Sequence, residues 1–182
     1  MSYFEQMRIS DGTSTADIDS ITSHLIVIAS DHHEVHEGDS YTLSDTQSVD
    51  TTTQNWMITT PDTSTRAHMT FDIRCTGEVY ILITEGADRA GSTALTKINR
   101  DRNSSNTSAL TIHRGYSGGT TDGATTIFTI RDGTTGNGNK TLASGGNRGQ
   151  NEFILKQNTK YIITVQTFDT VWVTVNLNWY EH

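Results

Sequence analysis

The chain contains a single cysteine, Cys75, and a single proline, Pro61. With one cysteine no internal disulfide can form, which fits a protein made in a reducing cytosol. No apolar run approaches the ~20 residues that a membrane-spanning helix needs. The first ten residues, MSYFEQMRIS, also lack the apolar core of a signal peptide. We therefore expect no membrane partner and no export route of the protein's own.

Positive charge is also scarce. Thirteen Lys and Arg stand against 21 Asp and Glu, for a formal net charge of −8. Phosphate backbones are bound by clustered Lys and Arg, and here the basic residues are scattered, so no nucleic-acid partner is expected. Leu, Ala, Glu and Lys are comparatively few, which argues against long helices.

The residues that are plentiful favour strands and turns. Thr is the commonest residue, and Ser, Asp, Asn and Gly are frequent among the 182 residues. Thr and Val suit pleated, half-buried surfaces, whereas Gly, Asn and Asp supply tight turns. This length fits one domain. We expect an extended N-terminal arm at 1–24 and an all-β domain at 25–182.

The clearest pattern lies in the last run of the chain, after a short turn at 168–170. Side chains alternate between the two faces of a strand, so a period of two predicts a strand with one apolar face. The apolar face holds Val171, Val173, Val175, Leu177 and Trp179. The opposite face holds Trp172, Thr174, Asn176, Asn178 and Tyr180. We expect this strand to lie inside a sheet, with its apolar face in the core.

Other runs predict further short strands, separated by turns. These strands are expected at 25–29, 40–43, 55–60, 66–74, 78–84, 109–114, 124–131 and 152–156, before the closing pair. The short glycine-containing turn between 66–74 and 78–84 predicts a hairpin. Polar loops are expected at 44–54, 85–106, 115–123 and 132–149. Many short strands joined by long connections predict a single-domain β-sandwich of jelly-roll or Greek-key type.

One stretch, 31–38, has residues that could form a metal site. On a strand, His32, Glu34 and His36 would share one face, and two imidazoles with a carboxylate can bind Fe(II), Zn(II) or Mn(II). Cupins place such sites in jelly-roll folds, but their His-x-His spacing is not present here. We favour imidazoles that hydrogen-bond to backbone or to neighbouring carboxylates, and expect no metal or other cofactor. No catalytic triad or phosphate loop is visible, so an enzyme is not expected.

The tryptophans allow two interpretations. Trp56, Trp172 and Trp179, with Tyr180, could form a platform on which sugars stack. Trp172 and Tyr180 share a face but lie eight residues apart, too far to form one platform alone. We favour packing in the core or in an interface.

Several short blocks resemble a family of small virion proteins of tailed bacteriophages. The blocks are 18–22, 31–41, 60–63, 99–105 and 178–182, in this order along the chain. The resemblance implies a head decoration (cement) protein that binds the outer surface of the capsid and stabilises the shell. It further implies a β-sandwich, commonly a homotrimer, whose partners are itself and the major capsid protein. The protein would be made in the host cytoplasm and located on the virion.

This role suggests three contact regions. The apolar residues of the arm, Tyr3, Phe4, Met7 and Ile9, are expected to lie against the capsid. Arg100 and Arg102 would pair with carboxylates of a neighbouring subunit. Trp172 and Tyr180 would form part of a subunit interface.

Two other functions stay open. One is a phage tail or fibre component that contacts the host or a glycan. The more remote one is a cupin-like metal-binding protein.

Overall fold

The computed structural model describes residues 30–133 and 152–182. Within these residues the chain forms one helix and eleven strands. The elements are α1 (Ser30–Glu37), β1 (Ser40–Val49), β2 (Thr53–Thr59), β3 (Ala67–Cys75), β4 (Val79–Glu85), β5 (Asp88–Ala94), β6 (Ile98–Asn99), β7 (Thr111–Thr120), β8 (Thr125–Asp132), β9 (Glu152–Ile154), β10 (Lys160–Thr167) and β11 (Val171–Glu181). The helix of this described part is too short and too polar to cross a membrane.

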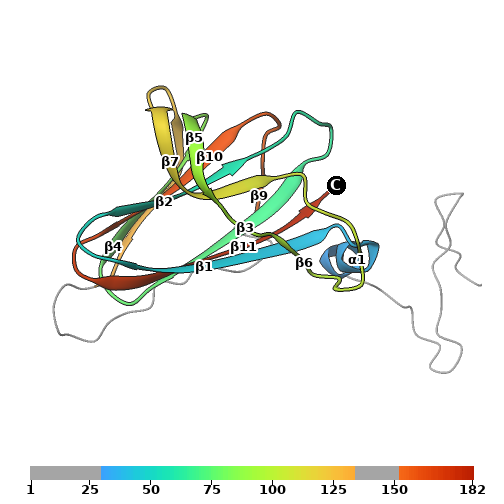
Figure 1. The fold of residues 1–182 in the computed structure, drawn as a ribbon, viewed down its shortest axis with the longest axis horizontal. Coiled ribbons are helices and arrows are strands. Elements are labelled where there is room, and N and C mark those ends of the chain that lie inside the picture. Colours follow the sequence, from blue (N-terminus) through green and yellow to red (C-terminus); the bar gives the residue numbers. More distant parts are fainter. Residues whose placement is uncertain (1–29, 134–151) are drawn as a thin grey trace, which may run out of the picture.

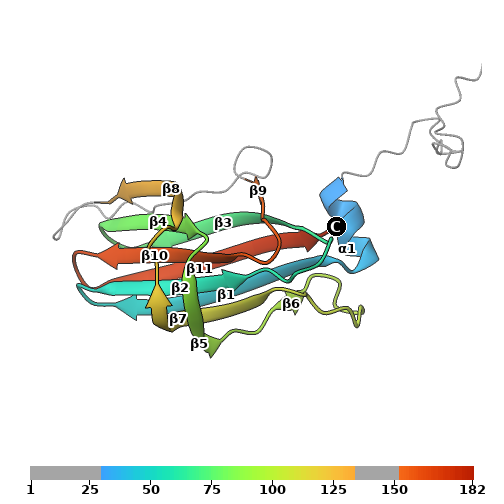
Figure 2. The same cartoon turned by 90° about the horizontal axis from the view of Figure 1, so that it is seen from above.

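The strands form two antiparallel sheets packed face to face (Figures 1 and 2). One has five strands in the order β6-β1-β11-β3-β9, and the other has six in the order β5-β7-β2-β10-β4-β8. Most successive strands lie in opposite sheets, so the chain repeatedly crosses the core. The predicted all-β sandwich is therefore confirmed, with the crossing connections expected of a jelly roll.

The core lies between the two sheets, where alternate residues of each strand point inward. β11 lies between β1 and β3, and its five apolar residues from Val171 to Trp179 are at most 1% exposed. Tyr41 of β1 stacks on Trp179, with ring centroids 5.8 Å apart. The inner faces of β2, β4 and β10 supply Trp56, Ile83 and Ile163 from the other side. The alternation seen in the sequence thus positions the largest buried side chains.

The predicted hairpin of 66–74 with 78–84 is wrong. β3 pairs with β11 and β9, whereas β4 pairs with β10 and β8 in the other sheet. The short link at 76–78 therefore carries the chain across the core. Gly77 suits this crossing because a Cβ there would collide with the side chain of Val171. Both runs have one apolar face, so the pattern alone cannot distinguish side-by-side strands from strands that face each other.

Several predicted loops contain strands. In the expected loop at 44–54, β1 continues to Val49 and β2 begins at Thr53. β5 and β6 lie within 85–106, and β7 covers most of 115–123. These segments are polar because they lie at a sheet edge or face solvent, so their pairing is made by backbone hydrogen bonds and leaves no apolar signal. The expected strand at 25–29 and most of the loop at 132–149 lie outside the described residues.

The strand interpretation of the histidine stretch is also wrong. Residues Ser30–Glu37 form α1, which ends where Gly38 adopts a φ of +80°. The backbone N–H of Gly38 donates to the carbonyl of Val35, and that of Asp39 donates to the carbonyl of Glu34. A glycine with positive φ directly after the last turn is a common helix stop. His32, Glu34 and His36 therefore do not share a face as they would on a strand.

Candidate functional site

The broadest candidate site is the outer surface of the five-stranded sheet, which we call the polar face. Its members are Thr42, Ser44, Thr46 and Ser48 of β1, Trp172, Thr174, Asn176, Asn178 and Tyr180 of β11, and His68, Thr70, Asp72 and Arg74 of β3. The strand register places them in rows, for example Thr46 beside Thr174 beside Arg74. The face arises because every second residue of three adjacent strands is polar or aromatic.

Hydrogen bonds hold the middle of the polar face in place. The hydroxyls of Thr46 and Thr174 lie 3.0 Å apart across β1 and β11. Arg74 makes an ion pair of 2.8 Å with Asp72, and this contact raises the pKa of the Arg74 guanidinium. Asn176 donates to the same carboxylate at 3.4 Å. These contacts fix the side chains in the middle of the polar face within the chain itself.

One end of the polar face is an aromatic pair. Tyr180 stacks on His68 with ring centroids 4.6 Å apart, and its hydroxyl lies 3.1 Å from His68 Nδ1. Ile154 of β9 lies beside His68 in the register and is 57% exposed. This end therefore presents apolar and aromatic surface next to polar groups.

The other end carries Trp172. Its backbone is held to Thr76 in both directions, by N–H donation to the Thr76 hydroxyl and by acceptance from the Thr76 N–H. Its side chain is 57% exposed. At about 3.4 Å per residue the eight-residue separation from Tyr180 is roughly 27 Å, so the two rings mark opposite ends of the face.

The other residues expected at interfaces lie elsewhere. Tyr3, Phe4, Met7 and Ile9 are outside the described residues. Arg100 and Arg102 are exposed in the connection after β6. The Arg100 guanidinium donates to the Ser40 hydroxyl at 3.4 Å and that of Arg102 to the Asn99 carbonyl at 3.3 Å. Neither pairs with a carboxylate within the described part of the chain.

Two carboxylates that point into the sandwich were missed by the sequence analysis. Asp45 accepts hydrogen bonds from the indole N–H of Trp56 at 2.7 Å and from Arg114 at 3.2 Å, and so joins the two sheets. Glu181 accepts from the indole N–H of Trp179 at 3.0 Å. Both acids occupy positions that the alternation of their strands assigns to the inward, apolar face. An acidic residue at such a position is the sequence signal that could have revealed them.

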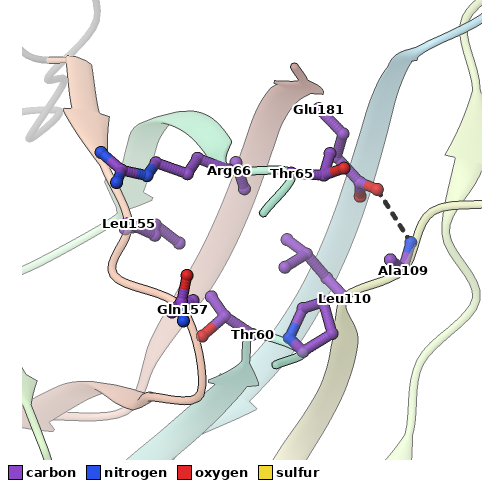
Figure 3. A pocket seen from close by; sticks show the side chains of 10 residues that line it. Thr60, Thr65, Arg66, Ala109, Leu110, Leu155, Gln157 and Glu181 are labelled. Atoms are coloured by element: carbon purple, nitrogen blue, oxygen red, sulfur yellow. Dashed lines mark hydrogen bonds between the residues drawn. The ribbon is translucent and has the colours of Figure 1, made fainter. Parts of the chain in front are cut away.

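Two hollows lie near Glu181. One, of about 10 Å³, has room for about a single water molecule and lies between Leu110, Leu155 and Glu181 (Figure 3). Here Glu181 accepts a hydrogen bond of 2.9 Å from the Ala109 N–H. A larger polar hollow beside α1 is lined by Tyr41, Glu181 and His182, among others. Burial raises the pKa of Tyr41 to about 12, so its hydroxyl stays protonated even at alkaline pH.

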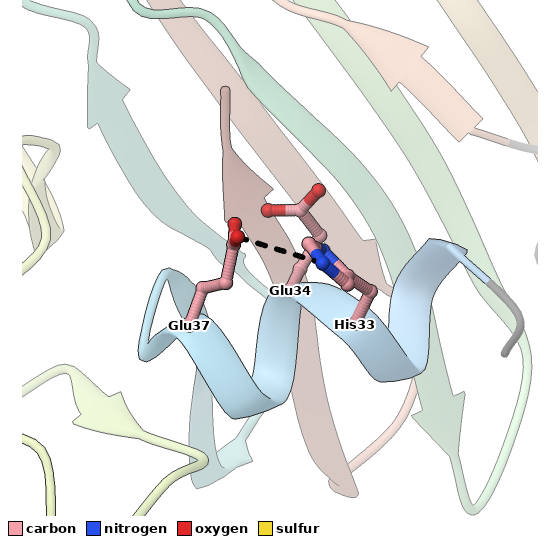
Figure 4. A group of neighbouring side chains, drawn as sticks. All are labelled: His33, Glu34 and Glu37. Atoms are coloured by element: carbon pink, nitrogen blue, oxygen red, sulfur yellow. Dashed lines mark ion pairs between the residues drawn. The ribbon is translucent and has the colours of Figure 1, made fainter. Parts of the chain in front are cut away.

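A cluster of possible metal ligands lies on α1. His33, Glu34 and Glu37 each offer one ligand atom, and these atoms all lie within 4.8 Å of one another (Figure 4). At about 100° per residue, positions 33, 37 and 34 fall within an arc of roughly 100° on a helix. Helical geometry thus selects a different set from the predicted His32, Glu34 and His36, with Glu34 in common.

No protein-family model, curated protein or solved structure matches the chain.

Proposed function

We propose that this chain is a structural protein that binds a protein shell through the polar face, as a head decoration protein of a tailed bacteriophage. The observation that carries the proposal is Trp172, a large aromatic side chain 57% exposed on an ordered sheet surface. Exposed aromatic side chains surrounded by polar groups are typical anchors of protein interfaces. The choice of a phage shell as the partner rests on the sequence resemblance.

The composition of the polar face supports a protein partner. Hydroxyl and amide groups alternate across it, with one Arg–Asp ion pair and an aromatic group at either end. Such a surface is too aromatic to favour free solvent and too polar for a core. We propose that a homotrimer or a contact with the major capsid protein covers it. A stable interface of this kind buries about 800 Å² on each partner.

The proposal can be tested by sizing and by capsid binding. The full chain would be sized by light scattering and then mixed with undecorated heads of the phage that encodes it, followed by sedimentation. Trp172→Ser is the test variant. Tyr80→Ser is the matched control, because Tyr80 is 36% exposed on the outer face of the other sheet.

We expect the wild-type protein and Tyr80→Ser to co-sediment with heads, and Trp172→Ser to lose trimers or head binding. If Trp172→Ser behaves as the wild type does, the polar face is not the interface. If the wild-type protein does not bind heads at all, the decoration role is wrong.

A glycan-binding tail or fibre component is the second candidate. An exposed indole beside hydroxyl and amide groups is also a surface on which a sugar ring can stack. Binding to a glycan array that Trp172→Ser abolishes, without binding to heads, would favour this function.

A further inference from the structure

Glu34 is the most unusual side chain of the cluster on α1. Glu34 is 8% exposed, and its Oε2 atom is buried with no hydrogen-bond partner in the described residues. Its other oxygen, Oε1, lies 3.8 Å from Nδ1 of His182. A buried carboxylate oxygen that lacks a partner is strongly unfavourable unless something compensates the charge. The position therefore calls for a positively charged partner.

The neighbours of Glu34 are the groups that bind transition metals. Nε2 of His33 lies 3.5 Å from Oε1 of Glu37, and both side chains are about half exposed. All three side chains project from the same side of the helix (Figure 4). Since the side chains of His33 and Glu37 are exposed, they can change rotamer to bring their ligand atoms to the spacing that coordination requires.

The imidazole of His182 lies next to Glu34 although it comes from the other end of the described chain. Its backbone is held by two hydrogen bonds with Arg66, and the preceding Glu181 donates its N–H to the carbonyl of Asp39. These bonds place the end of β11 next to α1, as both ribbon views show (Figures 1 and 2). The side chains of His33, Glu37 and His182 are each more than half exposed, so an ion could reach the group from solvent.

We propose that His33, Glu34, Glu37 and His182 bind one divalent transition-metal ion of the Zn²⁺ class. Two imidazole nitrogens and two carboxylate oxygens form a tetrahedral ligand set that suits Zn²⁺. With bonds of about 2.0 Å, tetrahedral ligands lie about 3.3 Å apart. The ligand atoms of His33, Glu34 and Glu37 lie within 4.8 Å of one another, and Nδ1 of His182 lies 3.8 Å from Oε1 of Glu34, so side-chain rotations would bring the four atoms to that spacing.

The bound ion would fasten α1 to the end of β11. In the described residues α1 continues directly into β1 through Gly38 and meets β11 through the Glu34–His182 contact. Coordination would convert that single contact into several bonds. This role is independent of the polar face, so its failure leaves the proposed function untouched.

Zinc binding to the untagged full chain, first stripped with a chelator, tests the proposal. Isothermal titration with Zn²⁺ measures affinity and stoichiometry. Absorption of the Co²⁺-loaded protein reports tetrahedral coordination. Glu34→Gln is the main variant because it preserves shape and removes the charge. His36→Ala is the matched control, because His36 lies on the same helix but outside the ligand group.

We expect one Zn²⁺ per chain, a raised thermal midpoint on addition of Zn²⁺, and no comparable response to Ca²⁺. Glu34→Gln should weaken Zn²⁺ binding by about 100-fold or more while the metal-free protein stays folded by circular dichroism. His36→Ala should bind as the wild type does. The proposal is overturned if Zn²⁺ does not bind, if Glu34→Gln binds equally well, or if His36→Ala abolishes binding.

Discussion

Replacing Asp45 by alanine should destabilise the sandwich substantially, because Asp45 is a polar link between its two sheets. The side chain is 12% exposed and accepts the indole N–H of Trp56, which is itself 0% exposed. Removing the acceptor leaves that N–H unsatisfied in the core, at a cost of about 1–3 kcal/mol. The contact with Arg114, whose side chain is 30% exposed, adds at most about 1 kcal/mol. We expect a total loss of about 1–4 kcal/mol.

The measurement is urea unfolding followed by far-ultraviolet circular dichroism. Asp45→Asn keeps an oxygen that can accept from Trp56, so it should lose about 1 kcal/mol. Asp88→Ala removes a carboxylate that is 86% exposed and should change stability by less than about 0.5 kcal/mol. A double-mutant cycle with Trp56→Phe should give a coupling of at least about 1 kcal/mol. A loss below about 0.5 kcal/mol for Asp45→Ala would show that Asp45 does not hold the two sheets together.

Three further predictions concern other parts of the fold. Burial raises the pKa of the Cys75 thiol to about 12, so Ellman's reagent should label it only after unfolding. Because the pKa of Cys75 is higher in the folded than in the unfolded chain, the thiol contributes fully to stability below pH 9 and contributes less as the pH rises towards 12. Cys75→Val should reduce this loss of stability at alkaline pH. A hydrogen bond from Lys156 lowers the pKa of Glu85. The pair therefore stabilises the fold above about pH 4.5, and this stabilisation is lost as the pH falls. Lys156→Met should narrow the difference between the urea midpoints measured at about pH 7 and at about pH 3. Gly119 has a φ of +65° and faces the carbonyl of Asp88, so Gly119→Ala should cost about 2 kcal/mol or more in the same unfolding assay. Rapid native labelling of Cys75, an unchanged pH dependence for Lys156→Met, or a neutral Gly119→Ala would each contradict its prediction.

The candidate sites were only partly predictable from the sequence. The alternation in 171–180 correctly places Trp172 and Tyr180 on one surface, because the period of a strand is a local property. It could not show that Tyr180 stacks on His68, since 112 residues separate them in the chain. The placement of His32, Glu34 and His36 on one face of a strand was wrong, because a short polar stretch carries no apolar period to distinguish a helix from a strand.

The all-β fold class and the inner and outer faces of β11 can be predicted from the sequence alone. They follow from local alternation and composition, which act on each strand separately. The packing of the two sheets is needed to show that β3 and β4 lie in opposite sheets, that Asp45 reaches Trp56 across the core, and that His182 meets Glu34 beside α1. Those contacts join residues far apart in the chain, and their geometry depends on how two sheets and one helix pack together.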